Sequence, residues 1–116
     1  MSLRSLSAAL LLAAGLRDYG VDLAPATVAP GALHVVVVNS GQRTHNLRLK
    51  GEAVDVRTPD LRPGEAATLE VDLTRPGAYA LFCDVAYHQQ KGMVAVLTVA
   101  ADAGGAPAAG VPPDGA

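Results

Sequence analysis

Residues 82–93 read Phe82-Cys83-Asp84-Val85-Ala86-Tyr87-His88-Gln89-Gln90-Lys91-Gly92-Met93. This stretch holds the only cysteine of the chain and its only methionine besides Met1. Four residues separate Cys83 from His88, and four more separate His88 from Met93. A thiolate, an imidazole and a thioether are the ligands that suit copper in a trigonal site of one cysteine and two histidines with a distant methionine. The stretch therefore predicts most of a copper site.

The second histidine of such a site is His45. It lies in Thr44-His45-Asn46-Leu47, at the start of an apolar alternating stretch that predicts a strand. Because 37 residues lie between His45 and Cys83, the site would join distant parts of the chain. The remaining histidine, His34, alternates with valines on one face of another predicted strand and has no ligand neighbours in sequence, so we interpret it as structural.

These residues carry a family resemblance. In their order, His45-Asn46, Cys83, His88 and Gly92-Met93 resemble the cupredoxins, small blue copper proteins of the plastocyanin and pseudoazurin kind. The resemblance covers about residues 19–100. It implies one copper ion that cycles between Cu(II) and Cu(I), with His45, Cys83, His88 and Met93 as metal ligands. It also implies a one-electron carrier rather than an enzyme.

The resemblance further implies contacts around the ligands. Asn46, which follows the first histidine, would tie the two ligand loops together by hydrogen bonding at Asp84, near the backbone after the cysteine. Redox partners would dock transiently at an apolar rim around His88, on a monomer. The chain departs from the family at Ala86-Tyr87, where related sequences often have Pro-Gly before the second histidine.

Two other classes of protein stay open. The first is a copper delivery or storage protein of the cell envelope, although Met-rich or His-rich ligand sets are missing. The second is an enzyme. A multicopper oxidase needs His-x-His pairs, which the chain lacks. A hydrolase could pair Cys83 with His88, but no Gly-rich oxyanion loop stands out and Met93 would have no role.

The composition limits the fold and the partners. A chain of 116 residues is long enough for one domain with one core. Half of its residues are hydrophobic, yet it has one Phe, three Tyr and no Trp, so Val, Leu and Ala must build that core. The net charge of −2 gives no basic surface, which argues against nucleic acid as a partner. One cysteine excludes an internal disulfide, a copper centre bridged by two thiolates and a Cys-rich zinc site.

Turn signals containing Pro-Gly or Ser-Gly divide the chain at short intervals, at residues 29–31, 39–41, 62–64 and 75–77. Between them, apolar runs predict seven strands, at residues 21–24, 32–39, 45–50, 53–56, 66–73, 78–83 and 94–100. This pattern predicts an all-β fold, an antiparallel β-sandwich with Greek-key connections. The resemblance implies that this sandwich is cupredoxin-like.

The two ends of the chain are expected to lie outside this domain. Residues 1–18 hold one early cation, an apolar run and small residues, which predicts a signal peptide or, alternatively, an N-terminal helix. We favour export, which places the protein in the periplasm or elsewhere outside the cytoplasm. The apolar run is too short to span a bilayer. Residues 101–116, made of Ala, Gly, Pro, Asp and Val, predict a disordered tail.

Overall fold

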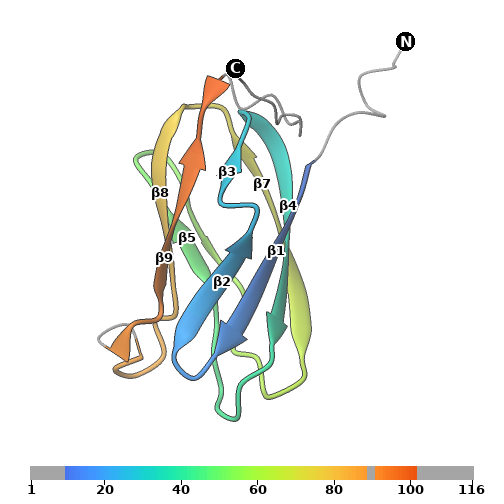
Figure 1. The fold of residues 1–116 in the computed structure, drawn as a ribbon, viewed down its shortest axis with the longest axis vertical. Coiled ribbons are helices and arrows are strands. Elements are labelled where there is room, and N and C mark those ends of the chain that lie inside the picture. The colour runs from blue at the N-terminus through green and yellow to red at the C-terminus, as the bar shows by residue number, and fades with distance from the viewer. Residues whose placement is uncertain (1–9, 89–90, 102–116) are drawn as a thin grey trace, which may run out of the picture.

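The computed structural model describes residues 10–88 and 91–101, which form nine β-strands and no α-helix. The strands are β1 (Leu10–Arg17), β2 (Gly20–Ala24), β3 (Thr27–Val28), β4 (Gly31–Asn39), β5 (Arg48–Lys50), β6 (Asp55–Arg57), β7 (Ala66–Leu73), β8 (Gly77–Phe82) and β9 (Val94–Val99). They form a four-stranded sheet in the order β2-β1-β4-β7 and a five-stranded sheet in the order β3-β9-β8-β5-β6 (Figure 1). The prediction of an all-β sandwich is confirmed. Within the described part of the chain, no helix has the length and hydropathy to cross a membrane.

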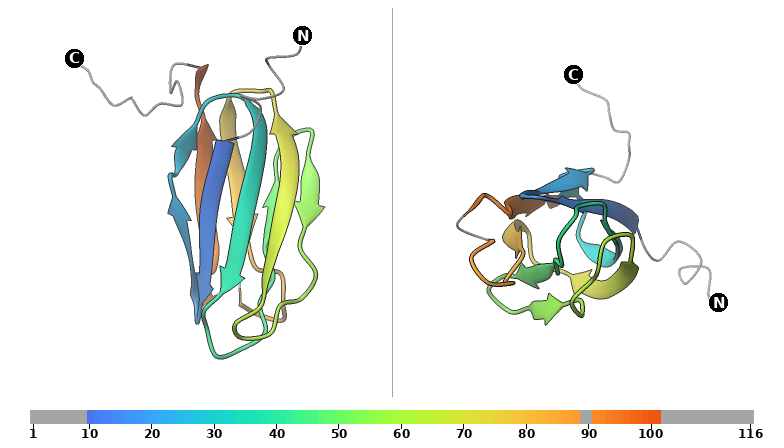
Figure 2. Two further views of the ribbon diagram at one scale, coloured as in Figure 1. Left: turned by 90° about the vertical axis from the view of Figure 1, so that its right-hand side faces the viewer. Right: turned by 90° about the horizontal axis from the view of Figure 1, so that it is seen from below.

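The core lies between the two sheets, which surround it when the molecule is seen from below (Figure 2). Every second residue of a strand points inward, as β4 shows with Leu33, Val35 and Val37 buried and Val36 and Val38 exposed. His34 lies on the same outer face as these two exposed valines. Leucine and valine make up most of the core, as the scarcity of aromatic residues requires.

The sandwich is mixed rather than purely antiparallel. Strand β1 runs parallel to β4, and the short β3 runs parallel to β9, while the other paired strands are antiparallel. The antiparallel prediction is wrong for these two pairs. After β2 the chain enters the other sheet as β3 and then returns as β4, so β4 joins β1 from the same end instead of by a hairpin.

The N-terminal boundary of the domain differs from the predicted one. Strand β1 lies between β2 and β4 in the first sheet, so the assignment of residues 1–18 to a segment outside the domain is wrong for residues 10–18. A run of Leu and Ala fits both a helical and an alternating period, and pairing with the valine-rich β4 gives it the second. Residues 1–9 and 102–116, where the rest of the signal and tail predictions fall, lie outside the described residues.

The substitution Leu12→Ala tests whether β1 packs in the core. Leu12 is 0% exposed and its neighbour Leu11 is 69% exposed. We expect Leu12→Ala to lower the free energy of unfolding by about 2–5 kcal/mol, because it leaves a cavity in the core. Leu11→Ala should change it by less than about 0.5 kcal/mol. Urea unfolding followed by circular dichroism measures both, and equal small effects would mean that β1 does not pack in the core.

Two predicted strands are shorter or shifted. The segment predicted as a strand from 45 to 50 becomes a strand only at β5, and His45 pairs with Leu61 in an isolated bridge. The His45 N–H donates to the Leu61 carbonyl at 3.0 Å, and the Leu61 N–H donates back at 2.7 Å. The predicted strand at 53–56 is β6, two residues later. Leu61 thus holds the backbone of His45 in place after β4.

Three connections meet at one end of the sandwich, the lower end in Figure 1. They are the turn between β1 and β2, the loop after β4, and the loop between β8 and β9. The predicted ligand residues come from the last two of these connections. The first connection is at residues 18–19, where the sequence prediction placed the boundary between the N-terminal segment and the domain.

Candidate metal centre

Cys83, His45 and His88 bring three ligand atoms together. Cys83 directly follows β8 and is 0% exposed, as is His45, while His88 is 9% exposed. The Nδ1 atoms of the two histidines lie 3.1 Å apart. Cys83 Sγ lies 3.5 Å from His88 Nδ1 and 3.9 Å from His45 Nδ1. The three residues thus form a buried group that could hold a metal ion.

The size of this triangle fits a metal ion. Given the three separations, a point equidistant from the sulfur and the two nitrogens lies about 2 Å from each, close to the usual metal–nitrogen and metal–sulfur bond lengths in proteins. One thiolate and two imidazoles are also the equatorial donors of a blue copper site. The donor set and the spacing therefore both fit one copper ion.

The backbone of the loop from Cys83 to Met93 holds these positions together. The Cys83 N–H donates to the Met93 carbonyl at 3.1 Å, and the Met93 N–H donates to the His88 carbonyl at 3.2 Å. Gly92 has a φ of 107°, which side chains disfavour, so glycine suits this turn. The Met93 side chain is fully buried. The loop therefore fixes Cys83, His88 and Met93 relative to one another.

Burial also affects the protonation of the Cys83 thiol and the His88 imidazole. It raises the pKa of the Cys83 thiol, which favours the neutral form. Burial, with the nearby His45 and Lys91, lowers the pKa of His88, which favours the neutral imidazole that metals bind. The metal-free site is therefore expected to hold a thiol, and a metal ion must displace its proton.

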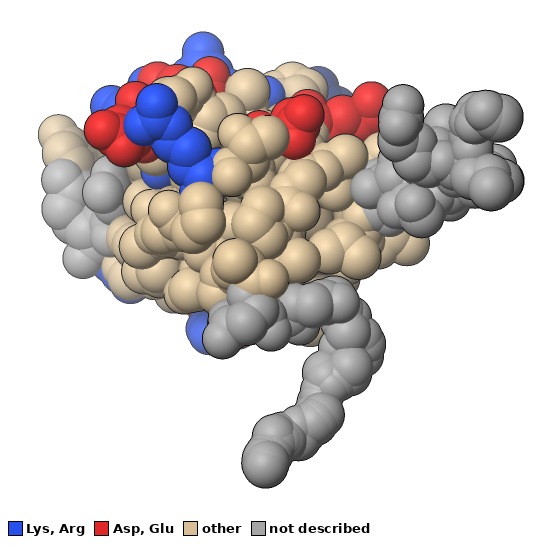
Figure 3. All heavy atoms as spheres, turned by 90° about the horizontal axis from the view of Figure 1, so that it is seen from above, with Lys and Arg blue, Asp and Glu red and all other residues tan. Residues whose placement is uncertain are grey.

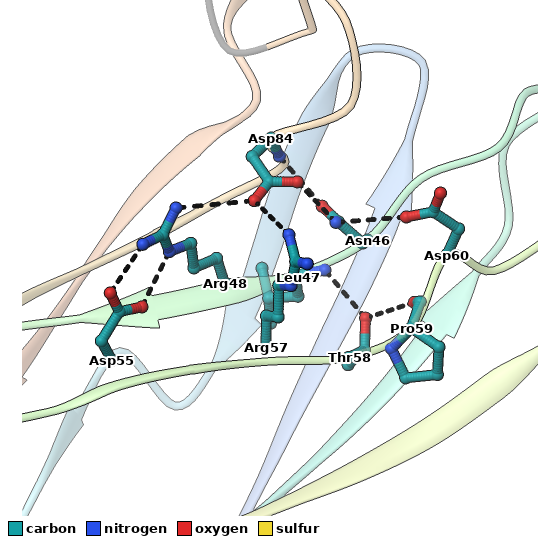
Figure 4. Close-up of polar contacts among 9 residues, drawn as sticks. All are labelled: Asn46, Leu47, Arg48, Asp55, Arg57, Thr58, Pro59, Asp60 and Asp84. Carbon is teal, nitrogen blue, oxygen red and sulfur yellow. Dashed lines mark hydrogen bonds and ion pairs between the residues drawn. The ribbon is translucent and has the colours of Figure 1, made fainter.

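Asn46 links the two ligand loops through Asp84 (Figure 4). Asn46 Oδ1 accepts a hydrogen bond from the Asp84 N–H at 2.9 Å, and Asn46 Nδ2 donates to the Asp84 carboxylate at 2.6 Å. The same carboxylate lies 3.2 Å from Arg57 and 3.7 Å from Arg48. The residue after His45 is thus joined to the residue after Cys83, and two arginines hold the second one from the side of β5 and β6.

Two residues at the site were missed by the sequence prediction. Asp18 Oδ1 lies 2.5 Å from His45 Nε2, and the Gln42 N–H donates to Asp18 Oδ2 at 2.9 Å. These two hydrogen bonds, that from Gln42 first, lower the pKa of the Asp18 carboxyl. The centre of the Tyr19 ring lies 5.0 Å from the centre of the His88 ring.

A local signal could have found both residues. The polar turn at residues 17–20 ends in Gly20 and separates a continuous apolar run from the predicted strand that begins at Val21, which is typical of a hairpin. Interpreting residues 1–18 as a leader hid this pattern. Asp18 and Tyr19 occupy the turn of that hairpin, between β1 and β2.

Comparisons with known proteins agree with the observed fold. The model of the multicopper oxidase family matches residues 31–103. Auracyanin from Roseiflexus castenholzii, reduced with dithionite, is 20% identical with a TM-score of 0.62, and the match covers 79% of this chain and 96% of that one. Rusticyanin is 14% identical with a TM-score of 0.62, covering 79% of each chain.

An enzyme has the same fold over part of its length. Copper nitrite reductase from Nitrosomonas europaea is 14% identical with a TM-score of 0.63, covering 78% of this chain and 41% of that one. No curated protein sequence matched the chain. At these identities the structural likeness concerns the fold, and the chemistry has to be argued from the three ligand atoms.

Proposed function

Because the chain belongs to the multicopper oxidase family and is a cupredoxin, we propose that it is a mononuclear blue copper protein that carries single electrons between redox partners. His45, Cys83 and His88 would hold the ion, with Met93 as a further, weaker ligand. Bound copper supplies a one-electron couple between Cu(II) and Cu(I). The observation that carries the proposal is the buried triangle of one sulfur and two Nδ1 atoms, with sides of 3.1–3.9 Å.

The surroundings of the triangle favour a carrier. His45 and Cys83 are fully buried, and backbone hydrogen bonds join Cys83 to Met93 and Met93 to His88. Asn46 and Asp84 connect the two ligand loops. Side chains held in this way cannot move far when the ion changes its charge, so little has to reorganise during electron transfer. The protein contributes fixed donors and excludes water from the ion.

Copper retention during redox cycling tests the carrier against the delivery protein and the enzyme. We expect the copper-loaded protein to be reduced and reoxidised repeatedly by one electron per chain, while the metal stays bound against a Cu(I) chelator. Buried thiolate ligands make release slow. Rapid transfer of Cu(I) to the chelator would support a delivery protein instead. Turnover of nitrite or of a phenol substrate would support an enzyme.

The role of Met93 is tested by two substitutions with opposite expected effects. The axial ligand of a blue copper site tunes the reduction potential. Met93→Leu removes a donor that helps to stabilise Cu(II), so we expect a higher potential. Met93→Gln supplies a harder oxygen donor, so we expect a lower one. Redox titration measures both, and shifts in the same direction, or none, would mean that Met93 is only part of the core.

We propose that redox partners dock beside His88. Tyr87 and Val94 are exposed there, and Tyr19 packs against the His88 ring with the Lys91 ammonium 4.8 Å from the Tyr19 ring centre. At the opposite end of the molecule, basic and acidic side chains lie side by side along one edge (Figure 3).

Tyr87→Lys should slow electron exchange with a small inorganic oxidant less than exchange with a protein partner. Equal slowing would argue against this docking site.

We propose a location outside the cytoplasm because a copper thiolate would face competing thiols in the cytosol. Strand β1 occupies residues that a leader of 18 residues would remove. Mass spectrometry of the protein from fractionated cells tests the location and the start of the mature chain. Recovery from the cytosol would contradict the proposal. Recovery outside the cytoplasm with residues 10–18 retained would support both the location and the fold.

A further inference from the structure

We propose that Asp18 is a positioning residue of the metal centre, which holds one tautomer of His45 and makes the site favour Cu(II). The inference rests on the proposed copper function. Asp18 lies in the β1–β2 turn, far in sequence from the ligands. Through Asp18, this turn would help to set the metal affinity and the reduction potential of the site.

The contact fixes the proton on the His45 ring. His45 is 0% exposed, so its Nε2 has to find its partner within the protein. That partner is Asp18 Oδ1 at 2.5 Å, and a carboxylate can only accept. Nε2 therefore carries the hydrogen, and the lone pair of Nδ1 points to Cys83 and His88, which lie 3.9 and 3.1 Å away. The contact selects the tautomer that a metal ion in the triangle needs.

The protein also holds the carboxylate in place. The Gln42 N–H donates to Asp18 Oδ2 at 2.9 Å, and the Asp18 side chain is only 22% exposed. The loop after β4 leaves room for the pair at Gly41, where a Cβ would clash with Asp18 Oδ1 and lie 3.0 Å from His45 Nε2. Gly41 is in turn held by its N–H, which donates to Asn39 Oδ1 at 2.9 Å. The loop is thus shaped around the contact between Asp18 and His45.

A negative charge on the far nitrogen makes the imidazole a stronger donor. A stronger donor stabilises the more highly charged ion, so Cu(II) gains more than Cu(I). The site with Asp18 should therefore bind Cu(II) more tightly and have a lower reduction potential than the same site without the carboxylate.

Asp18→Asn tests this inference, with Asp22→Asn as the matched control. Asp22 lies on the same hairpin, but its carboxylate pairs with Arg17 on the surface. We expect Asp18→Asn to lower Cu(II) affinity about 10–100-fold, as loss of such an outer contact does. Each tenfold loss that spares Cu(I) raises the potential by about 59 mV. Asp22→Asn should leave both unchanged, and Asp18→Glu should restore part of the affinity.

A readout without metal keeps the test independent of the copper function. Nitrogen-15 NMR of the metal-free protein should show the His45 hydrogen on Nε2, and Gly41→Ala should disturb this signal because it crowds the carboxylate. A hydrogen on Nδ1 in the unaltered protein would overturn the inference, even if Asp18→Asn failed to fold. Equal affinity and potential in the Asp18→Asn and Asp22→Asn proteins would overturn it too. An unaltered protein that binds no copper would instead refute the proposed function.

Discussion

The Cys83→Ser protein is expected to lose the intense visible absorption that the unaltered protein develops with Cu(II). The absorption of a blue copper site arises from charge transfer between the cysteine sulfur and the ion, and Cys83 is the only cysteine of the chain. Serine replaces the thiolate with a hydroxyl of similar size that stays protonated near neutral pH. Absorption spectra during titration with Cu(II) measure the effect.

The substitution should leave the metal-free fold intact, because the side chain changes by one atom in a site that is already polar. Circular dichroism and urea unfolding of the metal-free proteins provide the control. A folded Cys83→Ser protein that still turned blue would exclude Cys83 as the source of the colour. A folded variant that had lost the band, beside a blue unaltered protein, would support the thiolate ligand.

Removal of either histidine of the triangle is expected to have the second large effect. His45→Ala and His88→Ala each delete one of two nitrogen donors that lie 3.1 Å apart. The loss of a direct ligand should weaken Cu(II) binding by more than the roughly 10–100-fold that an outer contact costs. Competition with a chelator of known affinity measures the change.

His34→Ala is the matched control for both. His34 is the third histidine of the chain and lies on the outer face of β4, apart from the triangle. Its substitution should leave Cu(II) affinity and the visible band unchanged. If His34→Ala weakened binding as much as His45→Ala, the copper would be held by surface histidines rather than by the buried group.

Local spacing predicted the part of the site that lies within one loop. Cys83, His88 and Met93 are joined by backbone hydrogen bonds within that loop, so their intervals in sequence carry the information. The strand over residues 66–73 was predicted with the bounds of β7, because Leu69, Val71 and Leu73 alternate with polar residues. A pattern of period two specifies which face a residue lies on, wherever the strand pairs.

Long-range pairing decided what the sequence could not predict. The run at Leu10–Arg17 fits two periods, and only its place between β2 and β4 makes it a strand. The parallel direction of β1 beside β4 follows from the path of the chain through the other sheet between these strands. The alternation of apolar and polar residues carries no information about that path. Asp18 and Tyr19 reach the site because of this pairing, so a prediction that lacked β1 could not place either residue beside the histidines.

The X-ray absorption spectrum of the copper-loaded protein identifies the atoms around the metal and so shows whether the buried triangle binds it. With one equivalent of copper, we expect one short copper–sulfur bond and two imidazole nitrogens, for Cys83, His45 and His88. If only nitrogen and oxygen atoms surrounded the copper, with no short sulfur bond, the proposed site would be wrong.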